Sequence, residues 1–157
     1  MALQRLEEIR KFRLEKVNKL RELGINPYPS KVNDRRLEVK SARTKEGSVV
    51  EVAGRIWGWR AHGNSIFADL KDTSGKIQLF FQKKNLKNNF EILDLLDIGD
   101  FVWVSGKVFK TEAGEITIDA FDFQLLTKSI RPLPSTWHCL KDVEERYRKR
   151  YLDLLLN

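Results

Sequence analysis

Between residues 49 and 127 the sequence alternates apolar and polar side chains in short runs separated by turn-forming residues. This alternation has the two-residue period of a β-strand buried on one face. Three runs precede a helical patch that closes at Gly99, and two runs follow it. The runs fall at residues 50–59, 66–71, 77–82, 102–108 and 116–120. Their order predicts a mainly β fold with flanking helices, a five-stranded OB-fold Greek-key barrel. A sandwich and an SH3-like barrel compete with it, and the helix after the third strand disfavours both.

An N-terminal amphipathic helix is predicted over residues 3–23. Gly24 suits a left-handed helix end, and Pro27 and Pro29 prevent the helix from resuming. Apolar side chains at helical spacing mark its inner face: Leu6, Ile9, Val17, Leu20 and Leu23. Its other face is basic and contains Arg10, Lys11, Arg13 and Lys16. That face is either solvated or lies along an RNA backbone, with Arg10 and Arg13 as the contacts.

Four segments divide the chain. Residues 1–29 hold the helix and its proline stop, residues 30–48 form a connection with room for a short strand or turn, and residues 49–127 form the barrel. Residues 128–157 contain a linker and a second helix over 142–156, opened by Asp142. One face of that helix is apolar, through Val143, Tyr147, Tyr151 and Leu154 or Leu155. An uncovered apolar end is expected to pack on a further domain.

Composition narrows the class of protein. The 29 Lys and Arg residues exceed the 22 Asp and Glu residues and give a formal net charge of +7, which fits a nucleic-acid partner without requiring one. The single cysteine, Cys139, excludes an internal disulfide framework. No apolar run approaches the roughly 20 residues that cross a bilayer. We expect a cytoplasmic protein without a membrane partner.

Catalytic and metal-binding patterns are missing from the sequence. The histidines are His62 and His138, and with Cys139 they match no zinc-site spacing. Neither standard glycine-rich nucleotide loop occurs. Binding is therefore favoured over catalysis, with no cofactor or metal in this chain.

The strand positions that point away from the barrel core predict a base-reading surface. Phe67 falls between the inward residues Ile66 and Ala68, and an outward aromatic ring on such a barrel can stack a nucleobase. Gln78 offers a donor and an acceptor, and Glu115 offers acceptors only. With Arg60 these side chains form a candidate reader of a single base. The alternative is that Phe67 packs under the N-terminal helix and Glu115 is a plain surface acid.

Other residues could extend this surface. The two-residue alternation places Trp57 and Trp59 on the outer face of the first strand. There they either lengthen the stacking platform or lie under the helix or linker. Three lysines before the short helical patch face phosphates or form a solvated loop: Lys83, Lys84 and Lys87.

Several runs resemble a known family. The stretch from Val52 to Ile56, followed by Arg60, Gly63 and Phe67, is similar to the opening of the class II aminoacyl-tRNA synthetase anticodon-binding barrel. The runs GKIQLF, LDIGD and TEAGEITI, at residues 75–80, 96–100 and 111–118, resemble the subclass of the lysyl, aspartyl and asparaginyl enzymes. The stretches 125–134, 137–138 and 142–154 resemble lysyl-tRNA synthetases specifically, as does the helix that ends in GINPYP.

The resemblance implies roles for the same four residues. Phe67 matches the aromatic residue that stacks the central anticodon uridine, Gln78 the residue that hydrogen-bonds its uracil, and Glu115 an acid that helps select the anticodon. Arg60 matches the arginine seven positions before the stacking residue. Four positions depart from the family pattern, and the first three concern the neighbouring bases: Trp59, His62, Asn64 and Cys139.

The resemblance also implies the larger context. The family attaches lysine to tRNA in a catalytic domain that uses ATP and magnesium, usually as a homodimer. We therefore expect an N-terminal fragment that binds lysine tRNA, binds no DNA, connects to a catalytic domain of the same polypeptide and is inactive by itself. Two alternatives remain: an OB module that binds single-stranded RNA without base preference, and a protein-interaction domain.

Overall fold

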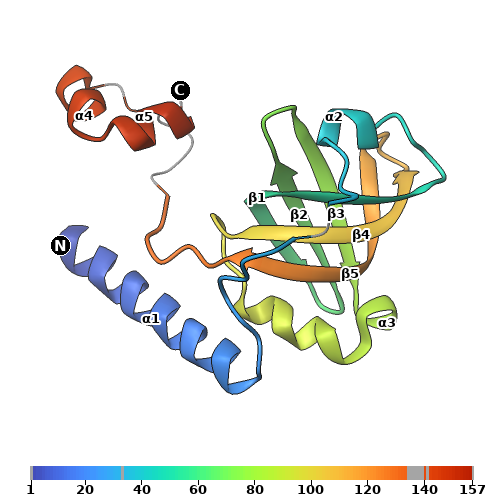
Figure 1. Ribbon diagram of the computed structural model, residues 1–157, viewed down its shortest axis with the longest axis horizontal. Helices are drawn as coiled ribbons and strands as arrows, with labels where there is room; N and C mark the ends of the chain where they lie inside the picture. The colour runs from blue at the N-terminus through green and yellow to red at the C-terminus, as the bar shows by residue number, and fades with distance from the viewer. Residues whose placement is uncertain (1, 33, 134–139, 141, 157) are drawn as a thin grey trace.

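A computed structural model describes residues 2–32, 34–133, 140 and 142–156 of the chain. Five strands form a barrel, with helices at its periphery (Figure 1). They are β1 (Val49–His62), β2 (Ser65–Lys71), β3 (Lys76–Gln82), β4 (Phe101–Lys110) and β5 (Ile116–Thr127). In the described part of the chain, no helix is both long and apolar enough to cross a membrane.

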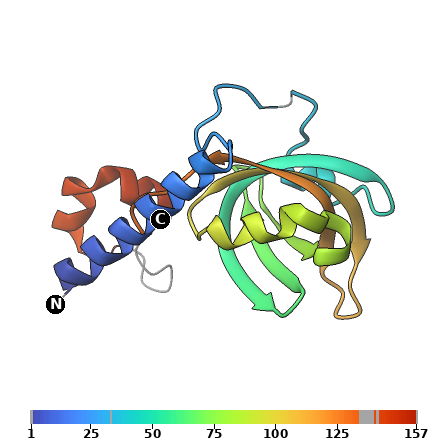
Figure 2. The ribbon, with the colours of Figure 1, turned by 90° about the horizontal axis from the view of Figure 1, so that it is seen from below.

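The barrel is closed in the strand order β1-β2-β3-β5-β4. Among these five strands, β3 and β5 pair in parallel, and the other four pairings are antiparallel. Alternate residues of every strand fill the interior, among them Val52, Leu70, Leu79, Phe81, Val104 and Ile118. The short helix α3 (Lys83–Leu86) and the 3-10 helix η1 (Lys87–Leu95) lie across one end of the barrel (Figure 2). This topology confirms the predicted OB-fold barrel.

A β-bulge at Trp57 interrupts the alternation of β1. The register against β2 shifts between Ile56 and Gly58, so every later residue of the strand changes face. Trp59 consequently points toward the core, where its ring centroid lies 6.2 Å from that of the buried Phe81. The prediction that Trp59 lies on the outer face with Trp57 was wrong, because a strict two-residue alternation takes no account of the extra residue at a bulge.

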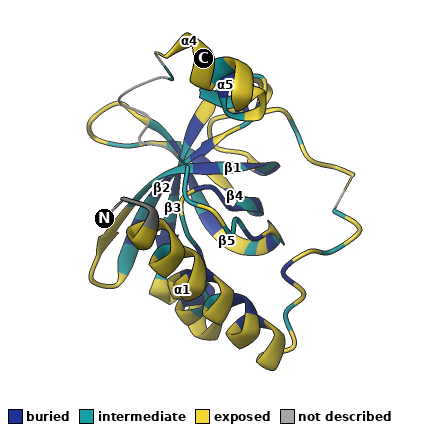
Figure 3. Ribbon diagram, turned by 90° about the vertical axis from the view of Figure 1, so that its left-hand side faces the viewer, coloured by how far each residue is buried: buried dark blue, intermediate teal, exposed yellow. Residues whose placement is uncertain are grey.

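The N-terminal helix α1 (Ala2–Glu22) forms as predicted, but its buried face differs from the predicted one. Val17 and Leu20 are buried against the rest of the fold, whereas Leu6 and Leu23 are 47% and 62% exposed. Figure 3 shows α1 largely exposed along its outer side. The barrel therefore supports mainly the C-terminal half of this helix.

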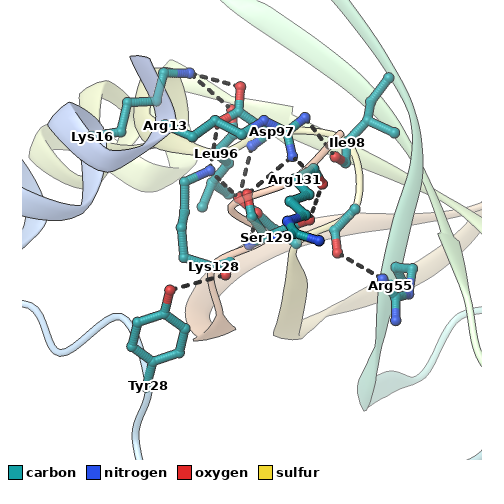
Figure 4. A network of polar contacts seen from close by, with 12 residues as sticks. Arg13, Lys16, Tyr28, Arg55, Leu96, Asp97, Ile98, Lys128, Ser129 and Arg131 are labelled. Atoms are coloured by element: carbon teal, nitrogen blue, oxygen red, sulfur yellow. Dashed lines mark hydrogen bonds and ion pairs between the residues drawn. The ribbon is translucent and has the colours of Figure 1, made fainter. Parts of the chain in front are cut away.

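Two basic side chains of α1 point toward the barrel (Figure 4). Arg13 is only 7% exposed and donates to the carbonyl oxygens of Ser129, Arg131 and Ile98 at 3.0, 3.2 and 3.1 Å. Lys16 donates to a carboxylate oxygen of Asp97 at 2.9 Å. The prediction of Arg13 as an RNA-backbone contact is corrected, because its guanidinium is already used within the fold.

A buried lysine completes this polar network. The ammonium of Lys128 lies 2.7 Å from a carboxylate oxygen of Asp100 and also contacts Asp97, and neither Lys128 nor Asp100 exposes its side chain. The hydroxyl of Tyr28 donates to the Lys128 carbonyl oxygen at 3.1 Å. The loop before β4, the segment after β5 and α1 are thus joined at one point.

The connection before the barrel contains the four-residue helix α2 (Val39–Ala42). Val39 and Ala42 are buried, and an isolated parallel bridge pairs Leu37 with Val52. The backbone N–H of Val39 donates to a carboxylate oxygen of Asp72 at 2.8 Å. This segment is therefore attached to the turn between β2 and β3.

The C-terminal segment forms two short helices in place of the single predicted one. These are α4 (Val143–Arg148) and α5 (Arg150–Leu156), and they lie on the same side of the barrel as α1 (Figure 1). Asp142 caps α4 as predicted, by accepting from the backbone N–H of Glu145 at 2.8 Å. Lys149, between the helices, has a non-helical backbone, and Asp153 is buried between the guanidinium groups of Arg146 and Arg150. This ion-pair cluster spans the break.

Candidate nucleic-acid interface

Two rows of side chains cross the outer face of β1, β2, β3 and β5. In the first row the strand register aligns Arg60 with Phe67, Phe67 with Phe80, and Phe80 with Asp119. In the second row it aligns Gly58, Asp69, Gln78 and Thr117. Directly opposite side chains of the antiparallel pairs, such as Phe67 and Phe80, have Cβ atoms about 5 Å apart. The structure therefore brings Arg60, Phe67 and Gln78 together on one surface, as the sequence predicted.

Aromatic rings form the centre of this surface. The rings of Phe67 and Phe80 are stacked, with centroids 4.5 Å apart and planes inclined by 19°. Phe109 of β4 lies beyond Phe80, at a centroid distance of 6.4 Å. Phe67 and Phe80 are both half-buried. Phe67 does not pack under α1, and its partial exposure leaves ring surface on which a planar base can stack.

Arg60 is positioned by a carboxylate. Its guanidinium donates to the two oxygens of Asp69 at 3.1 and 3.2 Å, a bidentate geometry. The hydrogen bonds that Arg60 donates to Asp69 raise the pKa of Arg60, burial opposes this, and the charges of Asp69 and Glu115 raise it further. Gly58 makes the pair possible, since a Cβ there would lie 2.3 Å from a carboxylate oxygen of Asp69. The guanidinium thus stays charged and is held beside the aromatic rings.

Glu115 lies in the turn between β4 and β5, beside this surface. The Thr111 hydroxyl accepts from the Glu115 N–H, and the Glu115 carbonyl accepts from the Thr111 N–H, both at 3.0 Å. Gly114 completes the turn with φ of +85°. The Glu115 carboxylate is exposed, and its charge acts on Arg60 across the barrel surface. Glu115 therefore lies beside Thr117, whose hydroxyl is 3.3 Å from the Glu115 carbonyl oxygen and bonds to Gln78.

Gln78 is held on its inner side by β5. The hydroxyl of Thr117 donates to the carboxamide oxygen of Gln78 at 2.9 Å, and Thr117 is fully buried. The carboxamide nitrogen remains able to donate to a ligand on the outer side.

The predicted lysines border the same surface. Lys83 and Lys84 are exposed at the start of α3 and line a shallow hollow of about 550 Å³ beside the Phe80 ring. The other side chains of the hollow are His62, Asn64, Ser65 and Gln82. Lys87 is exposed at the start of η1, and Arg10 is exposed on α1, where it pairs with Glu7 at 3.6 Å. Two positions that depart from the family pattern, His62 and Asn64, thus adjoin the aromatic rings.

Sequence reasoning missed several members of the surface, among them Asp69, Phe80 and Thr117. The first two share the outward parity of Phe67 and Gln78, so the alternation could have identified them. The role of Thr117 follows from the parallel pairing of β3 with β5, which no local pattern reveals. The predicted Trp57 does face outward, and the Lys71 ammonium, outside the two rows, lies 4.8 Å from its ring centroid. Trp137, His138 and Cys139 lie outside the described residues.

Comparison with known proteins connects this surface to a family. A family model described as an OB-fold nucleic acid binding domain matches residues 50–126. The chain is 45% identical over 161 aligned residues to the lysine–tRNA ligase of Carboxydothermus hydrogenoformans, and the match covers all of this chain and 33% of that protein. The lysine–tRNA ligase of Bacillus subtilis is 42% identical over 165 residues, covering 98% of this chain and 33% of that protein. The chain spans about a third of the length of the curated relatives it matches.

Proposed function

Because the chain belongs, through residues 50–126, to the family of OB-fold nucleic acid binding domains and is similar to lysine–tRNA ligases, we propose that it reads the anticodon of lysine tRNA. Its target is the central uridine of the anticodon. Phe67 stacks the uracil ring, Gln78 and Glu115 contact its edge, and Arg60 contacts a carbonyl or a phosphate.

The observation that carries this proposal is the stacked pair of Phe67 and Phe80, with hydrogen-bonding groups on both sides. A stacked base contributes roughly 1–3 kcal/mol to binding without regard to its identity. Identity is read by the polar groups at the edge of the base. A guanidinium fixed by Asp69 and a carboxamide fixed by Thr117 provide such groups in defined positions.

Electrostatic attraction supplies the part of the affinity that does not depend on sequence. The net charge is +7, and Lys83 and Lys84 border the aromatic rings. These lysines, with Lys87 and the more distant Arg10, are the proposed contacts to the RNA backbone. Each phosphate neutralised in this way increases the salt dependence of binding.

The activity of the whole protein is a further part of the proposal. We infer that the whole protein attaches lysine to tRNA with ATP and magnesium and acts as a cytoplasmic homodimer. Its catalytic domain lies in a part of the polypeptide outside these 157 residues. Among the described residues, no group of three or more His, Cys, Asp or Glu side chains is arranged to hold a metal ion. The expected result for this chain alone is tRNA binding without aminoacylation, measured by charging of lysine tRNA with radiolabelled lysine.

A titration with two RNA hairpins tests the reading of the anticodon. One hairpin carries a UUU anticodon loop, the other the same loop with its central uridine changed to cytidine, and both are measured at two salt concentrations. We expect tighter binding of the uridine loop at both. Equal, salt-dependent binding of the two would indicate an RNA surface without base preference, and absence of binding would indicate a protein-interaction domain. Either result overturns the proposal.

A further inference from the structure

Thr117 is a fully buried hydroxyl residue placed directly under the polar edge of the base-reading surface. It lies on β5, paired in register with Gln78 of β3, and its side chain points to the same outer face of the barrel. Its hydroxyl is 2.9 Å from the carboxamide oxygen of Gln78. The hydroxyl has one hydrogen, so the acceptor that receives it decides the orientation of the neighbouring groups.

The second acceptor near this hydroxyl is less favourable. The carbonyl oxygen of Glu115 lies 3.3 Å from the Thr117 oxygen, and it already accepts from the Thr111 N–H at 3.0 Å. The shorter bond to Gln78 places the carboxamide oxygen inward and the NH₂ group outward.

We propose that Thr117 is a positioning residue that fixes the Gln78 carboxamide with its NH₂ group toward the bound base, and so makes the surface prefer a carbonyl over an amino group on that base. This inference rests on the proposed function and specifies how its preference arises. Thr117 acts through Gln78 and does not touch the RNA.

The preference follows from the chemistry of the two pyrimidines. Uracil has a carbonyl oxygen at position 4, which accepts from the Gln78 NH₂ group. Cytosine has an amino group there, so two donors would face each other and one would lose its partner. If the carboxamide turned by 180°, its oxygen would face the base and favour cytosine. A fixed orientation is therefore necessary for discrimination, whereas stacking on Phe67 binds both bases.

Two substitutions that differ by one hydroxyl test the inference. Thr117→Ser keeps the hydroxyl and Thr117→Ala removes it, and both lose the same methyl group. Thr117→Val is the variant that preserves the shape of the side chain without the hydroxyl. Each 157-residue variant is titrated with the UUU hairpin and with the hairpin whose central base is cytidine. Thermal unfolding of each variant reports whether the barrel is intact.

The expected result is a change in preference and not only in affinity. Thr117→Ser should keep the wild-type ratio of the two dissociation constants within about twofold. Thr117→Ala and Thr117→Val should bind the uridine loop about three- to tenfold more weakly, as for the loss of one hydrogen bond, with a smaller change for the cytidine loop.

Two results overturn the inference while the proposed function stands. In one, Ala and Ser variants discriminate equally well. In the other, Thr117→Ala weakens both hairpins by the same factor, which indicates a purely structural role. A wild-type protein that fails to distinguish the two hairpins overturns the proposed function and this inference together.

Discussion

Arg60 and Asp69 form a bidentate ion pair across β1 and β2, and Gly58 leaves the space that the Asp69 carboxylate occupies. The pair ties the arginine to the second row of the surface, although its strand register aligns it with Phe67 in the first. Because Arg60 is half-exposed, the ion pair contributes little to folding. The ion pair instead restricts the conformations of the Arg60 side chain and so positions its guanidinium for RNA binding.

Replacing Gly58 with alanine should disturb this pair. The new Cβ would lie 2.3 Å from an Asp69 oxygen and 3.0 Å from its Cγ, so the carboxylate must move away from Arg60. We expect Gly58→Ala to destabilise the barrel by about 1–3 kcal/mol, as overpacking does, and to weaken binding of the uridine hairpin. Urea unfolding and hairpin titration measure the two effects. Gly75→Ala is the control, since a Cβ there meets only Val39 at 3.9 Å. Unchanged RNA binding by Gly58→Ala would show that the position of Arg60 is unimportant.

Removing the stacking ring should weaken binding without unfolding the barrel. Phe67 is half-buried on the outer face, so Phe67→Ala opens no cavity inside the core. Loss of one stacked base predicts a decrease of roughly 1–3 kcal/mol in binding free energy for both hairpins. Phe121→Ala is the matched control, because Phe121 is 45% exposed on β5. Wild-type affinity in a folded Phe67→Ala protein would contradict the stacking role.

Lys83 should act through its charge alone. It is exposed beside the Phe80 ring and is placed to meet a phosphate. Lys83→Ala is expected to lower affinity equally for the uridine and cytidine hairpins and to reduce the slope of log K against log salt by about 1. The exposed Lys45, before β1, supplies a control of equal charge. A loss confined to one hairpin would assign Lys83 to base recognition instead.

The sequence predicts most of this architecture because the outward positions of β2 and β3 follow a two-residue period. Phe67 and Gln78 could be placed on one surface for that reason. The same rule fails at Trp59, where one inserted residue at Trp57 reverses the strand face. It also cannot foresee the partner of Gln78, because Thr117 is 39 residues away and the two meet only when the barrel closes.

Arg13 shows a different limit of sequence reasoning. Helical periodicity assigns it to the basic face of α1, but the carbonyl groups that receive it come from residues more than 80 positions away. Arg13→Ala removes three hydrogen bonds from a charged donor and leaves the three carbonyl oxygens without the guanidinium as their donor. We expect a loss of about 2–3 kcal/mol in the free energy of unfolding, since hydrogen bonds to charged groups are the strong ones. Arg10→Ala, on the exposed side of the same helix, should change stability by less than about 0.5 kcal/mol. Equal stability of the two variants in urea unfolding would refute the structural role of Arg13.

Asp72 makes the stability of the barrel depend on acid pH. Burial favours its protonated form, but hydrogen bonds from the backbone of Val39, from Ser74 and from the Gly75 N–H lower the pKa of Asp72 below its usual value. In the unfolded chain the carboxyl group titrates near its ordinary pKa of about 3.9. Because the folded pKa is the lower one, the stabilisation is complete above that value and disappears as pH falls through the folded pKa. Asp72→Asn should therefore be less stable than wild type by about 1–2 kcal/mol at pH 7, and the difference should shrink below about pH 4. Urea unfolding of both proteins at pH 7 and pH 3 measures this, with the exposed Asp94→Asn as control. A stability difference that stays constant across this range would rule out the Asp72 carboxylate as its source.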